Sequence, residues 1–375
     1  MHIVSIEPTP SPHTMKINLS EALGTGQSRH YKKEDHKEAP VWLQAVLNID
    51  GVKAVYHVAD FLALDRYPSY DWKPILATVR QSFGEEPTES AVQRQSNDSF
   101  GEISVQIQKY AGIPMQIKLT NGESEKRVGL PTRFSDAVMQ LQTSGENVVL
   151  DRTWDDYGVR FGDFEDVGAT LVEELSALYP PERLTSLQKG ETTPFIEKYH
   201  RVTESDLDDP DWKVRYQRFE NMSDPTIEDL PVLKKALYDE KASIRRLAVV
   251  YLGMIEDKKV LPLLEQALND SSVTVRRTAG DAMSDLGMTE AIPAMVASLE
   301  DQNKIVRWRA AMFLYEVGDD TALPALEKAK DDDEFEVSLQ VQMAIERISG
   351  GGEAKGSIWK QMTEATMRSK KEDPS

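Results

Sequence analysis

The sequence predicts a multidomain protein in which two small α+β domains precede an all-α solenoid. Its 375 residues exceed what a single hydrophobic core usually organises. In the first half, short runs of alternating apolar residues lie between helical patterns, which is typical of α+β domains. In the second half, the sequence repeats every 31 residues from Asp208 to Ile348, as expected of a solenoid. Prolines mark the repeat at four equivalent positions, Pro231, Pro262, Pro293 and Pro324.

The composition indicates a folded protein and argues against several classes of function. Hydrophobic residues make up 40% of the chain and charged residues 29%, a balance typical of globular domains. The net charge of -19 disfavours nucleic acid and anionic membranes as partners, because their phosphates would repel it. The chain contains no cysteine, which excludes disulfides and cysteine-ligated metal or iron–sulfur sites. Since no signal peptide or long apolar run is evident, we expect a cytoplasmic protein.

Residues 1–84 predict the first α+β domain. Apolar residues alternate along Met15–Leu19, as in a half-buried strand, and recur at helical spacing after Pro40, which suits a first helical turn. Gly24–Lys37 is polar and is expected to be a loop. The expected elements are a strand at Ile3–Ile6, a strand at Met15–Leu19, a helix from Pro40 to Gly51, paired strands at 52–58 and 60–66, and a helix over 72–83.

Three pieces of this domain carry a family resemblance. The segments "TPSPHTMKI" (Thr9–Ile17) and "APVWLQAVLNIDGVKAVYHVADFLAL" (Ala39–Leu64), with the pair Asp71-Trp72, resemble the N-terminal domain of Nfu/NifU-type iron–sulfur scaffold proteins. In that family a separate downstream domain holds the cluster through a CxxC pair. This chain has no cysteine, so the resemblance implies the fold and a role in contacting partner proteins, without a cofactor. His13, inside the first piece, is a candidate partner-contacting residue.

Residues 85–98 predict a polar linker, and residues 99–187 predict a second α+β domain. Its expected elements are two adjacent strands at 103–107 and 113–119, a turn at Asn121-Gly122, a helix over 134–142, strands at 148–150 and 154–161, and a helix over 167–179 that Pro180-Pro181 ends. The acidic residues between Asp151 and Asp166 lack the glycine and glutamate spacing of a calcium loop. We therefore expect a solvated acidic surface there and no metal site.

After a second linker at 188–210, residues 211–349 predict the solenoid. A period of 31 residues accommodates two helices of about 11 to 12 residues and two turns. Equivalent positions form apolar columns, such as Ala248, Ala279, Ala310 and Val341, and each proline suits the start of a second helix. The first and last copies depart from the pattern, as capping repeats do. These repeats resemble short HEAT-like repeats, first noted in phycobilin lyases.

Two sets of charged residues are candidate sites within the repeats. Arginines and aspartates recur together, and we favour a structural ladder of helix caps and ion pairs over a line of anion-binding cations. The ladder comprises Asp239, Arg245, Asp270, Arg276, Asp301 and Arg307. The neighbouring arginines Arg246, Arg277 and Arg309 are expected to remain available to a partner, and Trp308 is either a contact residue or part of the core.

No catalytic motif is evident, and no cofactor, metal or small-molecule substrate is expected. The sequence contains no GxxxxGK[ST], GxSxG or HExxH string, and none of its six histidines lies in the repeats after Asp208. Residues 350–375 comprise a glycine hinge and an amphipathic tail, Ser357–Lys370. That tail could dock on the solenoid or bind as a helix in a partner's groove.

The order of the three domains resembles the conserved virulence factor C family of Gram-positive bacteria. That resemblance covers nearly the whole chain and implies a link to virulence-factor production in pathogens, with no established chemistry. We therefore predict a non-catalytic scaffold or adaptor that binds protein partners through the solenoid and the Nfu-like domain. The alternative is an accessory factor in iron–sulfur cluster assembly or iron delivery, acting through the Nfu-like domain without its own cluster ligands. An enzyme in the middle domain is a third hypothesis.

Overall fold

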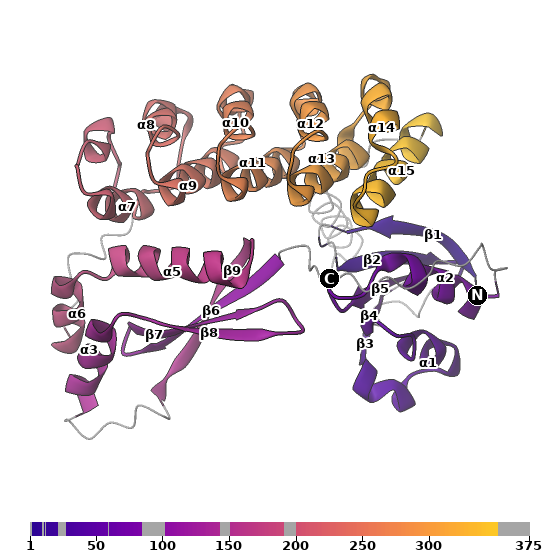
Figure 1. Cartoon of the computed structure of the whole chain (residues 1–375), viewed down its shortest axis with the longest axis horizontal. Coiled ribbons are helices and arrows are strands. Elements are labelled where there is room, and N and C mark those ends of the chain that lie inside the picture. Colours follow the sequence, from indigo (N-terminus) through magenta and orange to yellow (C-terminus); the bar gives the residue numbers. More distant parts are fainter. Residues whose placement is uncertain are drawn as a thin grey trace, which may run out of the picture. The chain divides into compact units, whose positions relative to one another are not determined.

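The computed structural model describes residues 2–9, 11, 13–21, 28–58, 60–84, 102–142, 151–190 and 200–351 (Figure 1). The chain divides into two compact units, residues 1–100 with 295–375 and residues 101–294. Each unit combines one small α+β domain with part of the helical repeats, so the predicted fold class is confirmed. The limits of the predicted domains and linkers remain predictions. Among the described residues, no helix is long and apolar enough to cross a membrane.

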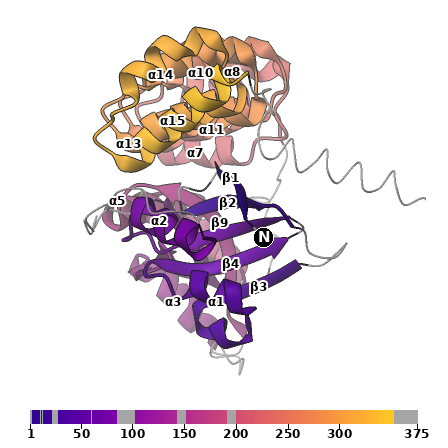
Figure 2. The same ribbon diagram turned by 90° about the vertical axis from the view of Figure 1, so that its right-hand side faces the viewer.

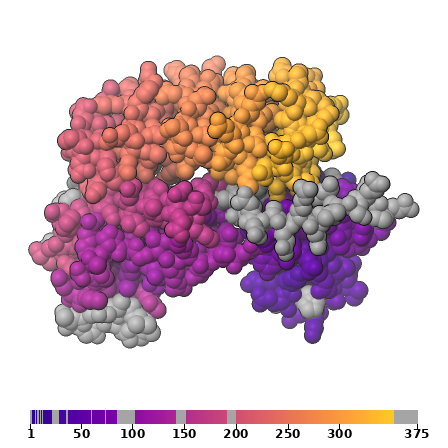
Figure 3. Space-filling view, viewed as in Figure 1, coloured from indigo at the N-terminus to yellow at the C-terminus, as the bar shows by residue number. Residues whose placement is uncertain are grey.

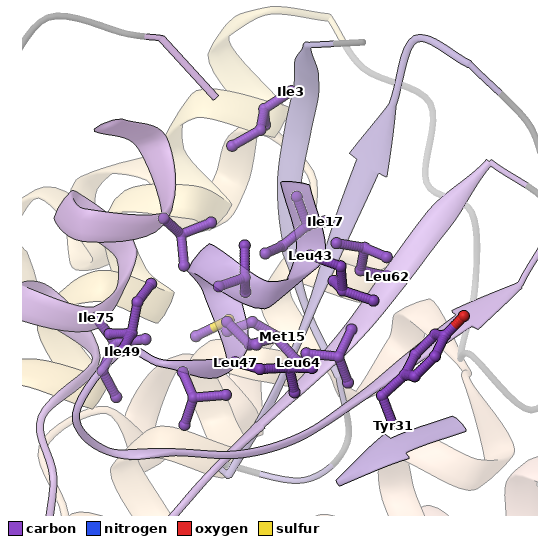
Figure 4. Packing of buried hydrophobic residues seen from close by; sticks show 14 of the residues in the cluster. Ile3, Met15, Ile17, Tyr31, Leu43, Leu47, Ile49, Leu62, Leu64 and Ile75 are labelled. Carbon is purple, nitrogen blue, oxygen red and sulfur yellow. The ribbon is translucent and has the colours of Figure 1, made fainter. Parts of the chain in front are cut away.

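The N-terminal domain is a five-stranded antiparallel sheet with two helices. The strands lie in the order β1-β2-β5-β4-β3. The elements are β1 (Ile3–Pro8), β2 (Thr14–Leu19), β3 (Ser28–Lys32), the 3₁₀ helix η1 (Lys33–Glu38), α1 (Val41–Leu47), β4 (Val52–Val58), β5 (Phe61–Arg66) and α2 (Trp72–Ser82). Alternate residues of β2 and β5, such as Ile17 and Leu62, are fully buried and pack with Leu43 of α1 (Figure 4).

Strand β3 corrects the predicted polar loop at Gly24–Lys37. It pairs with β4 in antiparallel register, and Tyr31 lies opposite Val55. Tyr31 is buried in the domain core, whereas its neighbours His30 and Lys32 are more exposed. A strand with one buried side chain gives almost no alternating pattern, which is why the sequence did not reveal it.

The repeats of the first unit lie against this domain. They comprise α13 (Lys304–Val317), the 3₁₀ turn η7 (Asp320–Ala322), α14 (Leu323–Ala329) and α15 (Phe335–Ser349). Phe335 and Leu339 of α15 pack against the core of the N-terminal domain. Figures 1 and 2 both show β1 and β2 on the side of the sheet that faces α15. Helix α13 is buried on nearly every side, as expected of a helix that packs between two layers.

In the part that the structure describes, the middle domain of the second unit is a four-stranded antiparallel sheet, ordered β8-β7-β6-β9, with three helices. Its elements are β6 (Glu102–Tyr110), β7 (Ile113–Thr120), β8 (Glu125–Gly129), α3 (Thr132–Gln142), β9 (Thr153–Phe161), α5 (Phe164–Leu178) and α6 (Pro181–Gln188). The expected strand at 148–150 lies outside the described residues. Two elements were not predicted. Strand β8 is exposed and polar, and Pro181 occupies the first turn of α6 in addition to following α5.

The boundary between the two units lies within α12 (Ile292–Ser298). The repeats of the second unit comprise η3 (Glu204–Leu207), α7 (Trp212–Glu220), η4 (Ile227–Asp229), α8 (Leu230–Ala236), α9 (Ala242–Gly253), η5 (Lys258–Val260), α10 (Leu261–Ala267), α11 (Val273–Leu286) and η6 (Thr289–Ala291). Helix α5 of the middle domain packs against α7, and atoms of the two parts touch directly (Figure 3).

Each repeat consists of a first and a second helix, and the second helices are shorter than predicted. Helices α8, α10, α12 and α14 each have seven α-helical residues, preceded by a three-residue 3₁₀ turn. Each proline follows the first residue of the α-helix, where a missing N–H is tolerated. The 3₁₀ turn supplies the remaining length, and the first helices α9, α11, α13 and α15 have 12 to 15 residues.

Candidate interaction sites

The arginines of the predicted ladder point along the repeats. In each described pair, Nε and Nη2 of the arginine both donate to one aspartate of the following repeat, a bidentate arrangement that fixes both side chains. In Arg245, Arg276 and Arg307, Nη1 also donates to the backbone oxygen of the aspartate that precedes its own helix, at 2.9, 2.9 and 3.0 Å. The bidentate pairs are Arg215–Asp239, Arg245–Asp270 and Arg307–Asp332, each with a shortest N···O distance of 2.7 Å.

The aspartates lie two residues before the N-caps of the first helices. The Oδ1 atoms of Asp239, Asp270, Asp301 and Asp332 accept hydrogen bonds from the backbone N–H two residues further on, at 2.7 to 2.9 Å. The N-cap residues are Lys241, Ser272, Asn303 and Glu334, so the prediction that the aspartates cap the helices is wrong. Each aspartate instead fixes the turn before a helix, and those in the bidentate pairs also hold an arginine. Arg215 and Asp332 were not among the predicted ladder residues. Asp332 could have been found, because it lies one 31-residue period after Asp301.

Most of the residues predicted to bind a partner are buried instead. Arg277 is 2% exposed, its guanidinium lies 4.1 Å from the ring centre of Phe161 in β9, and it pairs with Asp281. Arg309 and Trp308 are 5% and 4% exposed within α13. The expectation that Arg277 and Arg309 are available on the surface is therefore wrong, and Trp308 takes the second of its two expected places, in the core. Arg277 and Trp308 directly follow ladder arginines, and Arg277 lies on the side of its helix that contacts the middle domain.

The N-terminal domain docks on α15 through a buried ion pair. Arg66, at the end of β5, donates to Glu336 Oε1 at 2.8 Å, and their side chains are 1% and 10% exposed. The same guanidinium donates to the backbone oxygen of Tyr70 and lies 5.4 Å from the ring centre of Trp72. A small cavity beside this pair is lined by Thr9, Ser11, Thr14, Met15, Trp72, Trp308, Glu336, Leu339 and Gln340.

This contact uses residues that carry the Nfu-like resemblance. Thr9 and Thr14 come from the first conserved-looking piece, and Trp72 from the Asp71-Trp72 pair. His13 lies in the same loop, and neither of its ring nitrogens, both buried, has a hydrogen-bond partner. Burial, with the positive charges of Arg66 and Lys53, lowers the pKa of His13 to about 3.

The buried His13 predicts a pH-dependent stability of this domain. An unfolded chain binds a proton at His13 near its ordinary pKa of about 6.5, whereas the folded protein resists protonation until about pH 3. The unfolded state therefore binds more protons between these values, and stability should fall as the pH drops below about 6.5. Tryptophan fluorescence during urea unfolding at several pH values would measure this slope. His13→Leu should reduce it, whereas the exposed control His2→Gln should not, and equal slopes in the two variants would contradict the prediction.

The middle domain docks on the first repeats through a buried charged cluster. Glu174 of α5 is fully buried, its carboxylate lies 3.8 Å from Arg160 of β9, and neither of its oxygens has a hydrogen-bond partner. Burial lowers the pKa of Arg160, and the positive charge of Arg246 in α9 adds to this effect. Burial and the Glu174 carboxylate raise the pKa of Tyr216 in α7. The half-buried Arg246, predicted to face a partner, thus faces this cluster.

A groove lies between α12 and α14 in the first unit. It encloses about 540 Å³. Its apolar lining residues are Val296, Ala297, Leu299, Ala325 and Ala329, and its charged lining residues are Glu300, Arg307, Lys328, Asp331, Asp332 and Asp333. Among the described residues, no three histidine, aspartate or glutamate side chains are grouped so that they could hold a metal ion.

Profiles of three known families match successive parts of the chain. A family described as scaffold protein Nfu/NifU N terminal matches residues 4–89, and one described as virulence factor matches residues 108–187. HEAT repeats match residues 204–279 and 261–346. Among solved structures, protein SAV1430 of Staphylococcus aureus shares 37% identity over 22% of this chain and 99% of its own, with a TM-score of 0.21. Human deoxyhypusine hydroxylase is 21% identical over 58% of this chain and 63% of its own, with a TM-score of 0.31.

Two relatives that match over nearly their whole length share higher sequence identity with this chain than these solved structures do. An uncharacterized protein of Bacillus subtilis, YpgR, is 63% identical over 97% of this chain and 99% of its own length. A Staphylococcus aureus protein named conserved virulence factor C is 52% identical over 98% of this chain and 100% of its own length. The order of the three matched domains agrees with the resemblance seen in the sequence. This chain therefore belongs to the conserved virulence factor C family.

Proposed function

We propose that this protein is a non-catalytic cytoplasmic scaffold or adaptor whose repeats bind a protein partner. The observation that supports this most is the different use of the two helices in each repeat. The first helices hold the small domains, as α15 does through Glu336 and α11 through Arg277. The second helices instead expose side chains along their length, such as Pro231, Lys234 and Tyr238 in and just after α8.

The exposed side of the second helices suits protein recognition better than catalysis. It presents charged residues beside small apolar ones, for example Glu300 and Lys328 beside Ala297 and Ala325. Interfaces between proteins combine an apolar centre with a polar rim in this way. The buried clusters at Arg66 and Arg160 have their charges balanced by carboxylates of this chain, and they fix domains rather than offer reactive groups.

The iron–sulfur alternative has less support. It requires the Nfu-like domain to reach a partner, and the residues that carry the resemblance, Thr9, Thr14 and Trp72, line the contact with α15 instead. Any accessory role in cluster assembly would need a different surface of that domain. The scaffold proposal does not require the residues at the α15 contact to bind a partner.

Affinity purification of the tagged full-length protein from its native host, followed by mass spectrometry, tests this proposal. The variant carries three exposed substitutions: Glu265→Lys in α10, Glu300→Lys just after α12 and Glu327→Lys in α14. It should lose partners that the wild type retains, because charge reversal at an interface rim disrupts complementarity. A matched control, Glu123→Lys, Asp136→Lys and Glu182→Lys, alters exposed carboxylates of the middle domain. Identical partner sets for all three proteins, or no partner at all, would refute the proposed function.

A further inference from the structure

We propose that the groove between α12 and α14 binds a basic segment of the protein partner, with lysine or arginine side chains on either side of a small apolar one. This inference rests on the proposed function and names the chemistry of its partner. A volume of about 540 Å³ lies within the range of ligand-binding pockets, roughly 300 to 1,000 Å³. The apolar lining, which includes Val296, Ala325 and Ala329, would receive the apolar side chain.

The charge of the groove selects a basic occupant. Its lining residues include four carboxylates and two cations. Arg307 pairs with Asp332 at 2.7 Å, and Lys328 pairs with Glu300 at 2.5 Å. These two ion pairs use both cations of the lining and do not include the carboxylates of Asp331 and Asp333. Both of these aspartates are exposed. An approaching cation would meet two carboxylates on the same rim, next to an apolar lining that lowers the local dielectric.

The equivalent position two repeats earlier, between α8 and α10, has different side chains. There, Tyr238 and Gln266 occupy the positions of Glu300 and Lys328, and the Tyr238 hydroxyl donates to Gln266 Oε1 at 3.2 Å. A neutral hydrogen bond thus joins these two positions between α8 and α10, whereas the Glu300–Lys328 ion pair joins them between α12 and α14.

The residues around these two positions are also more basic and less apolar between α8 and α10 than between α12 and α14. Lys234, Lys235 and Leu263 stand between α8 and α10 where Val296, Ala297 and Ala325 line the groove. In addition, Asn269 and Ser271 replace Asp331 and Asp333. The two helix pairs, α8 with α10 and α12 with α14, have the same arrangement of elements but opposite charge. Of the two, the pair α12 and α14 combines small apolar residues with an acidic rim.

Fluorescence anisotropy with the full-length protein tests this inference directly. The probe is a fluorescein-labelled peptide of about twelve residues in which pairs of lysines flank single leucines. Its control replaces every lysine with glutamate. We expect the basic peptide to bind, with an affinity that falls as the salt concentration rises, and the acidic peptide not to bind.

Two sets of substitutions locate the site. Asp331→Lys with Asp333→Lys should weaken binding of the basic peptide about tenfold or more, since it reverses the rim. Glu300→Tyr with Lys328→Gln replaces the ion pair between α12 and α14 with the tyrosine hydrogen bond found between α8 and α10, and should weaken binding because the larger ring would fill part of the groove. The matched control Tyr238→Ala removes that hydrogen bond between α8 and α10, where the rim is not acidic, and should leave binding unchanged.

Three results would overturn the inference: no binding of the basic peptide, equal binding of the acidic one, or no effect of the groove substitutions. A synthetic peptide of residues 352–375 serves as a competitor. If it binds this groove more tightly than the basic probe does, the occupant is the chain's own tail and not a partner. The host purification separates the two proposals, because a partner that the groove variants still capture would refute the groove and leave the scaffold function intact.

Discussion

Replacing Glu336 with alanine is expected to lower the free energy of opening of the first unit by about 3–5 kcal/mol, the usual cost of removing one partner from a buried ion pair. The Arg66 side chain is 1% exposed and loses the carboxylate that lies 2.8 Å away. Its contacts with the Tyr70 backbone oxygen and the Trp72 ring carry no full negative charge. Hydrogen exchange of β1, β2 and α15, followed by mass spectrometry, would measure the change, since a multidomain chain seldom unfolds in two states.

A control two residues away, at the N-cap of α15, separates this effect from a general loss of charge at the start of that helix. Glu334 lies 3.5 Å from Lys304 and its side chain is 39% exposed, so Glu334→Ala should cost about 1 kcal/mol or less. Arg66→Met combined with Glu336→Leu should recover part of the stability, because apolar side chains replace both charges. Equal exchange rates in Glu336→Ala and Glu334→Ala would mean that the ion pair does not hold the domain.

Replacing Asp270 with alanine is expected to destabilise the second unit by a similar amount, about 3–5 kcal/mol. Its carboxylate accepts from Arg245 Nε and Nη2 at 2.7 and 2.8 Å and from the Ser272 backbone N–H at 2.7 Å. The variant thus loses the hydrogen bond that fixes the turn before α11, and it leaves a partly buried guanidinium without its counter-charge. Asp257→Ala is the matched control. It removes only the hydrogen bond from the Lys259 backbone N–H, and should cost about 1 kcal/mol.

The Asp270 contribution should also depend on pH. Burial by itself raises the pKa of Asp270, but the hydrogen bonds from Arg245 and Ser272 outweigh it, and the pKa is lowered overall. The stability due to Asp270 is therefore fully present well above the unfolded pKa of about 3.9 and is lost as the pH falls below that value. The difference in stability between wild type and Asp270→Ala should shrink below about pH 4. A difference that stays constant down to pH 3 would contradict this account.

Much of the repeat architecture could be predicted because it depends on local patterns. The proline positions mark the second helices, and the apolar columns mark the faces that pack. The aspartate–arginine spacing favoured a ladder, and the bidentate pairs of Arg245 and Arg307 have that geometry. Each of these features repeats every 31 residues, so a single chain contains several copies of the same signal.

The environment of the remaining side chains could not be predicted in the same way. Arg277, Arg309 and Trp308 lie on a helical face that the repeat pattern leaves unassigned, and an arginine there would ordinarily be exposed. Strand β3 and the pairing of Arg66 with Glu336 escaped for a related reason. The first depends on one buried tyrosine, and the second joins residues 270 positions apart.

The sequence by itself determined the three kinds of domain, the period of the repeats and the prolines and aspartates near the starts of their helices, because these follow from contacts within a helix or between neighbouring repeats. Tertiary structure alone decided which side of each repeat is covered. Docking of the small domains buries the first helices around Glu336 and Arg277, whereas the groove beside Asp331 and Asp333 stays open. That outcome depends on long-range packing between surfaces whose residues are scattered along the chain, and such packing has no periodic trace in the sequence.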